Sequence, residues 1–491
     1  APLLLIAAAG FSLEPAATHA PVQQRSAPGV ADTARGDPRF DAIRSRLANA
    51  VASDSLVSIA VAVAQGGKIV WEEAFGWADR ERKVRATPQT TYSLASITKP
   101  MTATAIMVLA ERGTVRLDAP ANQYLGSGKL RAFRGNADSA TVRHLLVHTS
   151  GLPTHYQFFY ADEAAKPPSM DETIRRYGIL VNTPGAVPQY SNLGFGILDH
   201  IIERASGRSY ADFMRDEVFR PLGLTRTAVV VNPAGARGTA IRYGARGEPL
   251  PFYDFDHRGA SAVYASVHDL VSFGMFFLKD RVPGQRRILS DSTIDAMYRE
   301  GNFHGYRSRY FAGGMPGVST SLLLLPSEDI AVAVVANTRS PLPARTMGDV
   351  VGVLLPDVAA KLAARQSQSR GEPTPVVPFT PGPQLVGEWS GTLRTWNDSL
   401  PFRLVVPPEG DARLQLAGRP EMPLSRARFN DGTLTGRFAG SVPTPDVSRQ
   451  PHEIALDLTL RGDTLSGVVA AVATADRIHF LLPSWVSLIR R

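Results

Sequence analysis

A polar, proline-rich stretch at residues 361–384 divides this chain into two parts that cannot share one hydrophobic core. It contains the run Gln-Ser-Gln-Ser-Arg-Gly-Glu-Pro-Thr-Pro, which begins at Gln366, and further prolines at 378, 381 and 383. Text of this kind offers few apolar side chains to bury and is typical of an interdomain linker. We therefore expect one domain to end near residue 360 and a second to begin near residue 385.

Two pairs of β-rich runs lie far apart in the first part of the chain. Residues 56–64 and 69–75 flank a Gln-Gly-Gly-Lys turn, and residues 319–325 and 330–335 flank a Pro-Ser-Glu-Asp turn. Each pair is typical of a β-hairpin. A sheet that contains both hairpins would bring the two ends of the domain together.

The sequence between those hairpins has the pattern of amphipathic helices. One apolar stripe consists of Ile197, Leu198, Ile201, Ile202 and Ala205. Gly207 follows it in the position that commonly ends a helix, and Ser266 with Asp269 three residues later is typical of a helix start. We therefore predict an α+β domain over residues 37–360, in which helices flank an antiparallel sheet.

The last part of the chain, residues 385–491, alternates short β-rich runs with turns such as Asp431-Gly432 and Gly462-Asp463. This pattern predicts a small antiparallel β-sandwich or barrel. Trp389 and Trp396 are expected in its core. The acidic residues Asp398, Glu409 and Asp411 lie in turn-like text and form no catalytic pattern.

The composition excludes several classes of protein. The chain has no cysteine, which rules out a disulfide framework, a thiolate metal site, a cysteine nucleophile and an acylated lipoprotein anchor. Its formal net charge is +8, but the basic residues are spread thinly and form no run with interleaved aromatics, so we expect no nucleic-acid partner.

The N-terminal segment resembles an export signal. Residues 3–13 are apolar, Glu14 and Pro15 interrupt them, and Thr18-His19-Ala20 resembles the end of a cleavage site. We interpret residues 1–20 as part of a signal peptide and residues 21–36 as a linker. The expected location is periplasmic or secreted, and no later segment is apolar for long enough to span a membrane as a helix.

Several familiar motifs are absent from the sequence: the Gly-x-Ser-x-Gly elbow, the His-Glu-x-x-His zinc motif, the Walker loop and the Rossmann glycine fingerprint. Asp254, Asp256 and His257 could coordinate a metal in principle, but we interpret them as a polar loop. We therefore expect neither a metal nor a cofactor.

The sequence Ser96-Ile97-Thr98-Lys99 begins a helical run that ends before Gly113. Pro100 fits the first turn of a helix, and a separation of three residues places the serine and the lysine on one face. A serine hydroxyl needs a neighbouring base, and a lysine among apolar atoms can lose its proton near neutral pH. The alternative is a capped helix with a solvated lysine.

Tyr190-Ser191-Asn192 is a second candidate group, located after Pro184-Gly185 and directly before the helix at residues 194–206. A tyrosine beside a lysine ammonium can have its phenol pKa lowered and can then carry a proton. An asparagine amide can hold a substrate carbonyl or orient the lysine.

Four segments in this order resemble the serine β-lactamase-related hydrolases, a family that includes class C β-lactamases, D-alanyl-D-alanine carboxypeptidases, D-aminopeptidases and β-lactamase-like esterases. The segments are Ser96–Lys99, His144–Leu152 (His-Leu-Leu-Val-His-Thr-Ser-Gly-Leu), Pro184–Asn192 and Phe219–Leu224 (Phe-Arg-Pro-Leu-Gly-Leu). The resemblance covers about residues 40–360. It implies an antiparallel sheet paired with a mostly helical subdomain, and it is specific as a set.

The resemblance also implies a mechanism without cofactor or metal. Ser96 would be acylated by the substrate and then deacylated by water. Lys99 and Tyr190 would share the roles of base and proton shuttle, and Asn192 would contact the substrate. The implied partner is a small ester, a β-lactam or a peptide substrate. The resemblance leaves open whether the protein is located near the cell wall. His148 and Ser150 would be structural, at a helix end.

The third motif of the family, normally Lys-Thr-Gly or His-x-Gly, aligns with Phe311-Ala312-Gly313 and is followed by Gly314. The resemblance implies substrate contacts at Phe311 and Gly313, and an oxyanion hole formed by the backbone N–H groups of Ser96 and Gly314. The usual cation is missing, which should weaken recognition of β-lactams and peptide C-termini. Arg307 or Arg309 could supply a substitute charge.

Three hypotheses follow. The first is a serine hydrolase of carboxylesterase type that forms an acyl-enzyme at Ser96. The second is a β-lactamase, or an amide hydrolase of the D-alanyl-D-alanine carboxypeptidase or D-aminopeptidase type, which Phe311 disfavours. The third is a catalytically silent binding protein with the same fold, which the presence of Ser96, Lys99 and Tyr190 together disfavours.

Overall fold

The computed structural model describes residues 37–133, 135–280, 282, 284–298, 301–368, 379–475 and 477–491. The predicted signal peptide (1–20) and the linker that follows it (21–36) lie outside these ranges, so export remains a prediction. None of the described helices is long and apolar enough to cross a bilayer.

The first domain is organised around a seven-stranded antiparallel sheet with the strand order β11-β12-β13-β14-β1-β2-β3. Its strands are β1 (Ser58–Gln65), β2 (Lys68–Asp79), β3 (Val84–Arg85), β11 (Gly301–Phe303), β12 (Tyr306–Met315), β13 (Val318–Leu325) and β14 (Ile330–Ala336). Both predicted hairpins are therefore confirmed. β1 pairs with β14 from Ile59 opposite Ala336 to Gln65 opposite Ile330, so the sheet joins the two ends of the domain as expected.

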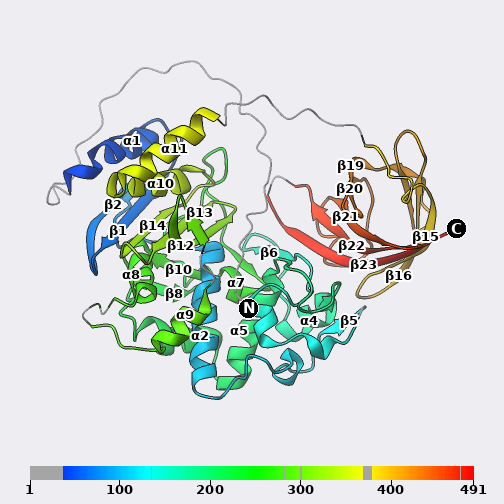
Figure 1. Cartoon of the computed structure of the whole chain (residues 1–491), viewed down its shortest axis with the longest axis horizontal. Helices are drawn as coiled ribbons and strands as arrows, with labels where there is room; N and C mark the ends of the chain where they lie inside the picture. The colour runs from blue at the N-terminus through cyan, green and yellow to red at the C-terminus, as the bar shows by residue number, and fades with distance from the viewer. Residues whose placement is uncertain are drawn as a thin grey trace.

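Helices cover both faces of this sheet (Figure 1). One layer contains α1 (Asp41–Ala52), α10 (Leu342–Leu354) and α11 (Pro356–Gln368), and the opposite face carries α8 (Val267–Leu278). The alternation along β1 explains this arrangement, because Ile59, Val61 and Val63 join the core with α1 and α10. The alanines at 60, 62 and 64 face the other core, and their small side chains let α8 pack closely against the sheet.

The remaining helices form a subdomain on the α8 side of the sheet. They include α2 (Thr98–Glu111), α3 (Val142–Leu146), α4 (Met170–Tyr177), α5 (Asn192–Ser206), α6 (Tyr210–Phe213), α7 (Arg258–Ser261), α9 (Asp291–Met297) and the π-helical turn η5 (Met214–Phe219). Two predicted helix ends are confirmed: Gly207 ends α5 at φ +69°, and the Ser266 side chain accepts a hydrogen bond from Asp269 N at the start of α8.

Short elements complete this domain. They are η1 (Pro38–Phe40), η2 (Ala95–Ile97), η3 (Ala121–Gln123), η4 (Ala137–Ser139), β4 (Thr91–Ser93), β5 (Arg131–Ala132), β6 (Tyr156–Tyr160), β7 (Ile179–Leu180), β8 (Thr227–Val229), β9 (Tyr253–Phe255) and β10 (Val263–Ser266). β10 pairs with β4, the strand directly before the Ser96 turn.

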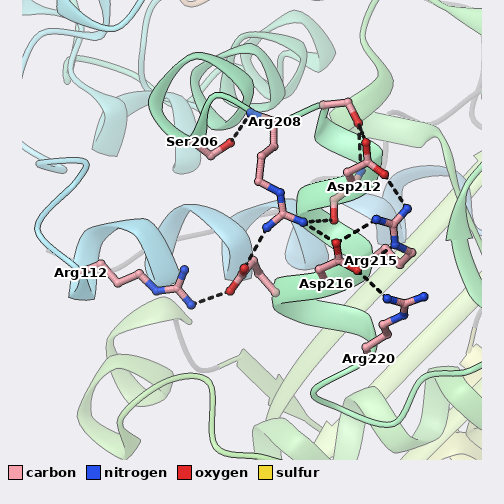
Figure 2. Close-up of polar contacts among 9 residues, drawn as sticks. Arg112, Ser206, Arg208, Asp212, Arg215, Asp216 and Arg220 are labelled. Atoms are coloured by element: carbon pink, nitrogen blue, oxygen red, sulfur yellow. Dashed lines mark hydrogen bonds and ion pairs between the residues drawn. The ribbon is translucent and has the colours of Figure 1, made fainter.

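An ion-pair network holds the ends of α2 and α5 together (Figure 2). Asp216 accepts from Arg208, Arg215 and Arg220, while Glu217 accepts from Arg208 and Arg112. Arg112 caps the end of α2, and Arg208 follows Gly207, which caps the end of α5. Exposed ion pairs contribute little individually, but Glu217 links the C-terminal ends of the two helices through Arg112 and Arg208.

The second domain is a nearly closed antiparallel β-barrel. Its strands are β15 (Gly387–Arg394), β16 (Ser399–Val406), β17 (Arg413–Leu416), β18 (Met422–Pro423), β19 (Ser425–Asn430), β20 (Thr433–Phe438), β21 (His452–Arg461), β22 (Thr464–Ala473) and β23 (Phe480–Arg490). The strand order runs from β18 at one edge to β19 at the other, and only Leu424 separates these two edges in sequence. The sheet must therefore curl until its edges meet. Trp389 is fully buried, as expected, whereas Trp396 is only partly buried.

The barrel docks on the helical subdomain. β23 continues its sheet onto β6, with Phe480 opposite Gln157, and the Tyr177 hydroxyl donates to the Asp446 carboxylate across the interface. We predicted that the linker begins at residue 361, and this boundary is wrong because α11 continues to Gln368. Apolar positions such as Val358 anchor this helix on the first domain, and residues 369–378 lie outside the described part of the chain.

Candidate active site

Ser96 lies in the short 3₁₀ turn η2, directly before α2. It is partly exposed, while the residues from Tyr92 to Ala95 and from Ile97 to Pro100 are buried. The preceding Ala95 has φ +48°, a left-handed conformation that costs about 1–2 kcal/mol for a residue with a Cβ. Backbone strain of this kind is concentrated at functional sites, and here it directs the Ser96 hydroxyl out of the core.

Lys99 lies one helical turn from Ser96, as the spacing predicts, and its side chain is completely buried. Its Nζ lies 3.1 Å from Ser96 Oγ, 2.9 Å from Asn192 Oδ1 and 3.2 Å from the carbonyl oxygen of Ala260. No carboxylate of the described residues forms an ion pair with it. Burial lowers the pKa of Lys99 well below its usual value, so the neutral amine is favoured.

The neutral form that burial favours can satisfy all three neighbours of this amine. An uncharged amine has two N–H donors and one lone pair. Asn192 Oδ1 and the Ala260 carbonyl can only accept hydrogen bonds, so they take both N–H groups. The lone pair is then left for the hydroxyl of Ser96, which is the arrangement that a general base requires.

Tyr190 completes the group, because its hydroxyl lies 2.9 Å from Ser96 Oγ. Burial raises the pKa of Tyr190 to about 12, and the hydrogen bond with Ser96 only partly offsets this effect. The expectation that the pKa of this phenol is lowered is therefore wrong in this structure, because Lys99 is itself favoured as a neutral amine and supplies no full positive charge. Tyr190 is a neutral hydroxyl that can accept and donate a proton.

The ring of His148 packs against the ring of Tyr190. The two rings lie 4.5 Å apart between centroids, and His148 Nδ1 accepts a hydrogen bond from Ser191 N at 3.1 Å. Burial lowers the pKa of His148 to about 3. His148 is thus a neutral structural residue, as expected, and Ser150 is buried beside it, where its hydroxyl accepts from Leu152 N at 3.4 Å.

Asn192 begins α5 and connects two parts of the site. Its Oδ1 accepts from Lys99, and its Nδ2 donates to the carbonyl oxygen of His155 at 3.1 Å, which fixes the orientation of the amide. These contacts give Asn192 a role in holding Lys99. The substrate contact implied by the family resemblance remains a prediction.

The third motif lies on β12 beside the nucleophile. A Cβ built on Gly313 would lie 2.3 Å from the carbonyl oxygen of Leu94 and 3.2 Å from Ala95 Cβ, so only glycine lets this strand approach the Ser96 turn. Phe311, on the same face of the strand, is 2% exposed and packs against Tyr298. Its ring belongs to the core, so the implied substrate contact has no support from its position.

Neither arginine proposed as a substitute charge has the required position. Arg309 is buried, donates to the carbonyl oxygen of Phe277 at 3.0 Å and lies over the ring of Tyr298. Arg307 lies opposite Asn302 in the β11–β12 hairpin, four residues from Phe311 and therefore about 13 Å along the strand. The expectation is wrong for Arg309 because it is buried on the same face of the strand as Phe311. Instead, the guanidinium of Arg339 lies against Gly314.

A buried cluster beneath Asn192 was only partly foreseen. The Asp256 carboxylate bridges two histidines, with Oδ2 2.8 Å from His155 Nε2 and Oδ1 2.7 Å from His257 Nδ1. Asp256 and His257 lie in the loop between β9 and α7, as interpreted from the sequence, and all three residues are buried. Asp254 pairs instead with Arg258. His155 was missed because it lies 101 residues from Asp256 and belongs to no local pattern.

His155, Asp256 and His257 are also the described residues that could hold a metal ion, since their ligand atoms lie within 4.8 Å of one another. Their hydrogen bonds offer a simpler explanation. Burial alone would raise the pKa of Asp256, but the two histidines hold it below its usual value. The cluster thus fixes His155, whose carbonyl oxygen orients Asn192, and the start of α7, whose Ala260 carbonyl contacts Lys99.

Comparison with known proteins shows the family and the fold of this chain. The model of the beta-lactamase family matches residues 43–354. Protein flp of Staphylococcus aureus (strain MRSA252) is 25% identical over 300 residues, covering 57% of this chain and 59% of flp, so the chain spans less than two thirds of that relative. The octameric penicillin-binding protein homologue from Pyrococcus abyssi has a TM-score of 0.58 at 22% identity, covering 90% of this chain and 99% of that chain.

A second solved structure, EstCE1, described as a hydrolase with promiscuous acyltransferase activity, has a TM-score of 0.51 at 20% identity and covers 62% of this chain and 94% of its own. The two solved structures are only 22% and 20% identical to this chain, so the similarity shows the fold alone. The family model covers more than half of the chain and includes Ser96, Lys99, Tyr190 and Asn192. The chain therefore belongs to the beta-lactamase family of serine hydrolases.

Proposed function

We propose that this protein is an esterase of carboxylesterase type that forms an acyl-enzyme at Ser96. One observation carries the proposal: Lys99 Nζ has two obligate acceptors, Asn192 Oδ1 and the Ala260 carbonyl, and a hydroxyl at 3.1 Å. This arrangement gives the free enzyme a neutral base already aimed at its nucleophile.

The proposed reaction has two halves. Ser96 Oγ attacks the ester carbonyl carbon while its proton passes to Lys99 Nζ, and the backbone N–H groups of Ser96 and Gly314 hold the oxyanion. The tetrahedral intermediate collapses, the C–O bond to the alcohol breaks, and the alcohol oxygen receives a proton from Tyr190, which recovers one from Lys99. Water then attacks the acyl-enzyme, loses its proton to the same pair and releases the acid.

The apolar third motif favours esters over amides. An alcohol leaves more readily than an amine, which must be protonated as it departs, so an ester makes smaller demands on the proton relay. In this chain Phe311 stands where the family usually has a cation, and its ring is buried. The similarity of the fold to EstCE1 supports a hydrolase.

Hydrolysis of β-lactams or of peptides ending in D-amino acids is the second candidate. The similarity to the penicillin-binding protein homologue of Pyrococcus abyssi favours it, and so does the cation that Arg339 places beside Gly314. A silent binding protein is disfavoured, because Ser96 Oγ lies within hydrogen-bonding distance of both Lys99 Nζ and the Tyr190 hydroxyl.

The test uses two active-site probes on the full chain, a fluorophosphonate and a fluorescent penicillin. Labelling of Ser96 by the phosphonate together with turnover of simple aryl esters supports the esterase. Labelling by both probes, with penicillin turnover above ester turnover, moves the assignment to the second candidate. Absence of labelling by either probe would refute both and leave the silent protein. Ser96→Ala is the control that identifies specific labelling.

A further inference from the structure

Arg339 follows β14, and its guanidinium takes the place of a side chain on Gly314. A Cβ built on Gly314 would lie 1.8 Å from Arg339 Nη1 and 3.0 Å from its Cζ. Gly314 is not among the residues with positive φ, so its backbone does not require glycine. The missing side chain instead provides the space in which the guanidinium lies.

The register of the sheet holds Arg339 in this position. Ser319 on β13 lies opposite Gly314 on one side and opposite Ala336 of β14 on the other. The next turn is fixed to the same point, because Ser340 N donates to Ser319 Oγ at 2.9 Å. The chain therefore crosses back over β13 after β14 ends, and this crossing brings Arg339 to β12.

This location is at the rim of the candidate active site. Gly313 packs directly against Leu94 and Ala95, the two residues before Ser96. Gly314 is the next residue on β12 and is exposed. A substrate whose carbonyl is held by Ser96 N and Gly314 N would therefore have the guanidinium of Arg339 within reach of its neighbouring groups.

The positive charge at this position is available to a ligand. Arg339 is exposed, and within the described part of the chain no carboxylate or carbonyl accepts a hydrogen bond from its side chain. This contrasts with the arginines around Asp216, which are engaged in ion pairs. A free guanidinium offers a planar fork of donors that matches a carboxylate.

We propose that Arg339 binds a carboxylate of the substrate, so that the enzyme prefers esters that carry a carboxylate on their acyl or alcohol side. This inference rests on the proposed esterase function and names its substrate class. The charge enters the site from the β14–α10 turn, whereas Phe311 on β12 is apolar and buried. A carboxylate that pairs with Arg339 would place the ester carbonyl beside Ser96.

The test compares matched esters that differ in one charge. Para-acetoxybenzoate and para-acetoxybenzamide differ in a carboxylate on the alcohol side. The para-nitrophenyl monoester of terephthalic acid and its amide analogue differ in a carboxylate on the acyl side. The measured quantity is the ratio of kcat/KM for the anionic ester to that for its neutral partner, in at least one of the two pairs.

The wild-type ratio should be about tenfold in favour of the anionic ester, the effect expected for one charge-assisted pair at a partly exposed site. Arg339→Ala should bring the ratio close to unity mainly through a higher KM for the anion, Arg339→Lys should keep part of the preference, and Arg339→Glu should reverse it. Higher ionic strength should weaken the wild-type preference.

Arg82→Ala is the control, because its side chain is 82% exposed in the turn between β2 and β3, at the other edge of the sheet from β12. It should leave the ratio unchanged. Wild-type enzyme that hydrolyses both members of each pair at equal kcat/KM, with no change in Arg339→Ala or Arg339→Glu, would overturn the inference and leave the esterase standing. Failure to hydrolyse any of the four esters would refute the esterase function and this inference with it.

Discussion

Lys99 Nζ lies 3.1 Å from Ser96 Oγ while the lysine side chain has no solvent exposure. Burial without an anionic partner is costly for an ammonium, and the pKa of Lys99 is accordingly lowered. The protein thus bears a stability cost at neutral pH in order to keep a base next to its nucleophile. This relationship leads to predictions about both stability and activity.

The stability of the protein should depend on pH through Lys99. The unfolded chain has a lysine pKa of about 10.4, whereas the folded value is depressed, so unfolding takes up a proton between the two values. The contribution of the neutral lysine is fully present above about pH 10.4 and is lost as the pH falls toward the folded pKa. Urea denaturation should therefore show that the free energy of unfolding of Lys99→Met increases relative to that of the wild type as the pH is lowered from 10. A difference that does not vary with pH would contradict a depressed pKa.

Tyr190→Phe should lower kcat/KM for esters by about 10²- to 10⁴-fold, because it removes the hydroxyl that exchanges a proton with Ser96. The phenylalanine ring can still stack on His148, so the midpoint of thermal unfolding should change little. Steady-state kinetics and calorimetry on the same preparations separate the two effects. Unchanged kcat/KM would remove Tyr190 from the mechanism.

His148 should make the protein sensitive to acid. Its folded pKa of about 3 lies below the ordinary value of 6.5, so its contribution is present above pH 6.5 and is lost as the pH falls toward 3. The loss amounts to at most about 1.4 kcal/mol per pH unit. His148→Asn tolerates the left-handed φ of +56° and should flatten this part of the stability profile.

His268 provides a control of opposite sign for that experiment. Its hydrogen bond to Glu72 raises its pKa, so its contribution is present at low pH and is lost as the pH rises through the folded value. The effect of His268→Asn should be smaller, because the side chain is 39% exposed. Acid profiles of the same shape for wild type and His148→Asn would refute the assignment of His148.

Asp256→Asn should destabilise the protein by about 3–5 kcal/mol, the usual effect of removing one member of a buried charged network. It should also lower kcat, because His155 and the start of α7 position the groups that contact Lys99. Asp254→Asn is the matched control two residues away: its partner Arg258 is 44% exposed, so the change should cost much less. Equal losses in the two variants, measured by urea denaturation, would argue against a special role for Asp256.

Local sequence rules predicted the parts of this structure that depend on nearby residues. The helical spacing placed Ser96 beside Lys99, and the turn residues identified both hairpins of the sheet. Tyr190 lies 94 residues from Ser96, and only the order of the family motifs indicated that the two would meet.

Other features depend on contacts that no local pattern encodes. Arg339 reaches Gly314 because of the register of β12, β13 and β14, which is set only when the sheet is assembled. Arg309 was an attractive candidate by proximity in sequence, but strand alternation turns it into the core. His155 and Asp256 meet only after β6 pairs with β9, the two strands next to them in sequence.

The central claim is that Ser96, activated by Lys99, carries the acyl group. The most direct measurement is mass spectrometry of enzyme quenched during turnover of an aryl ester, followed by peptide mapping. The account predicts one acyl group on Ser96 in the wild type, and none in Ser96→Ala or in Lys99→Arg, whose guanidinium cannot serve as a base. An acyl group on any other residue, or ester turnover that survives in Ser96→Ala, would contradict it.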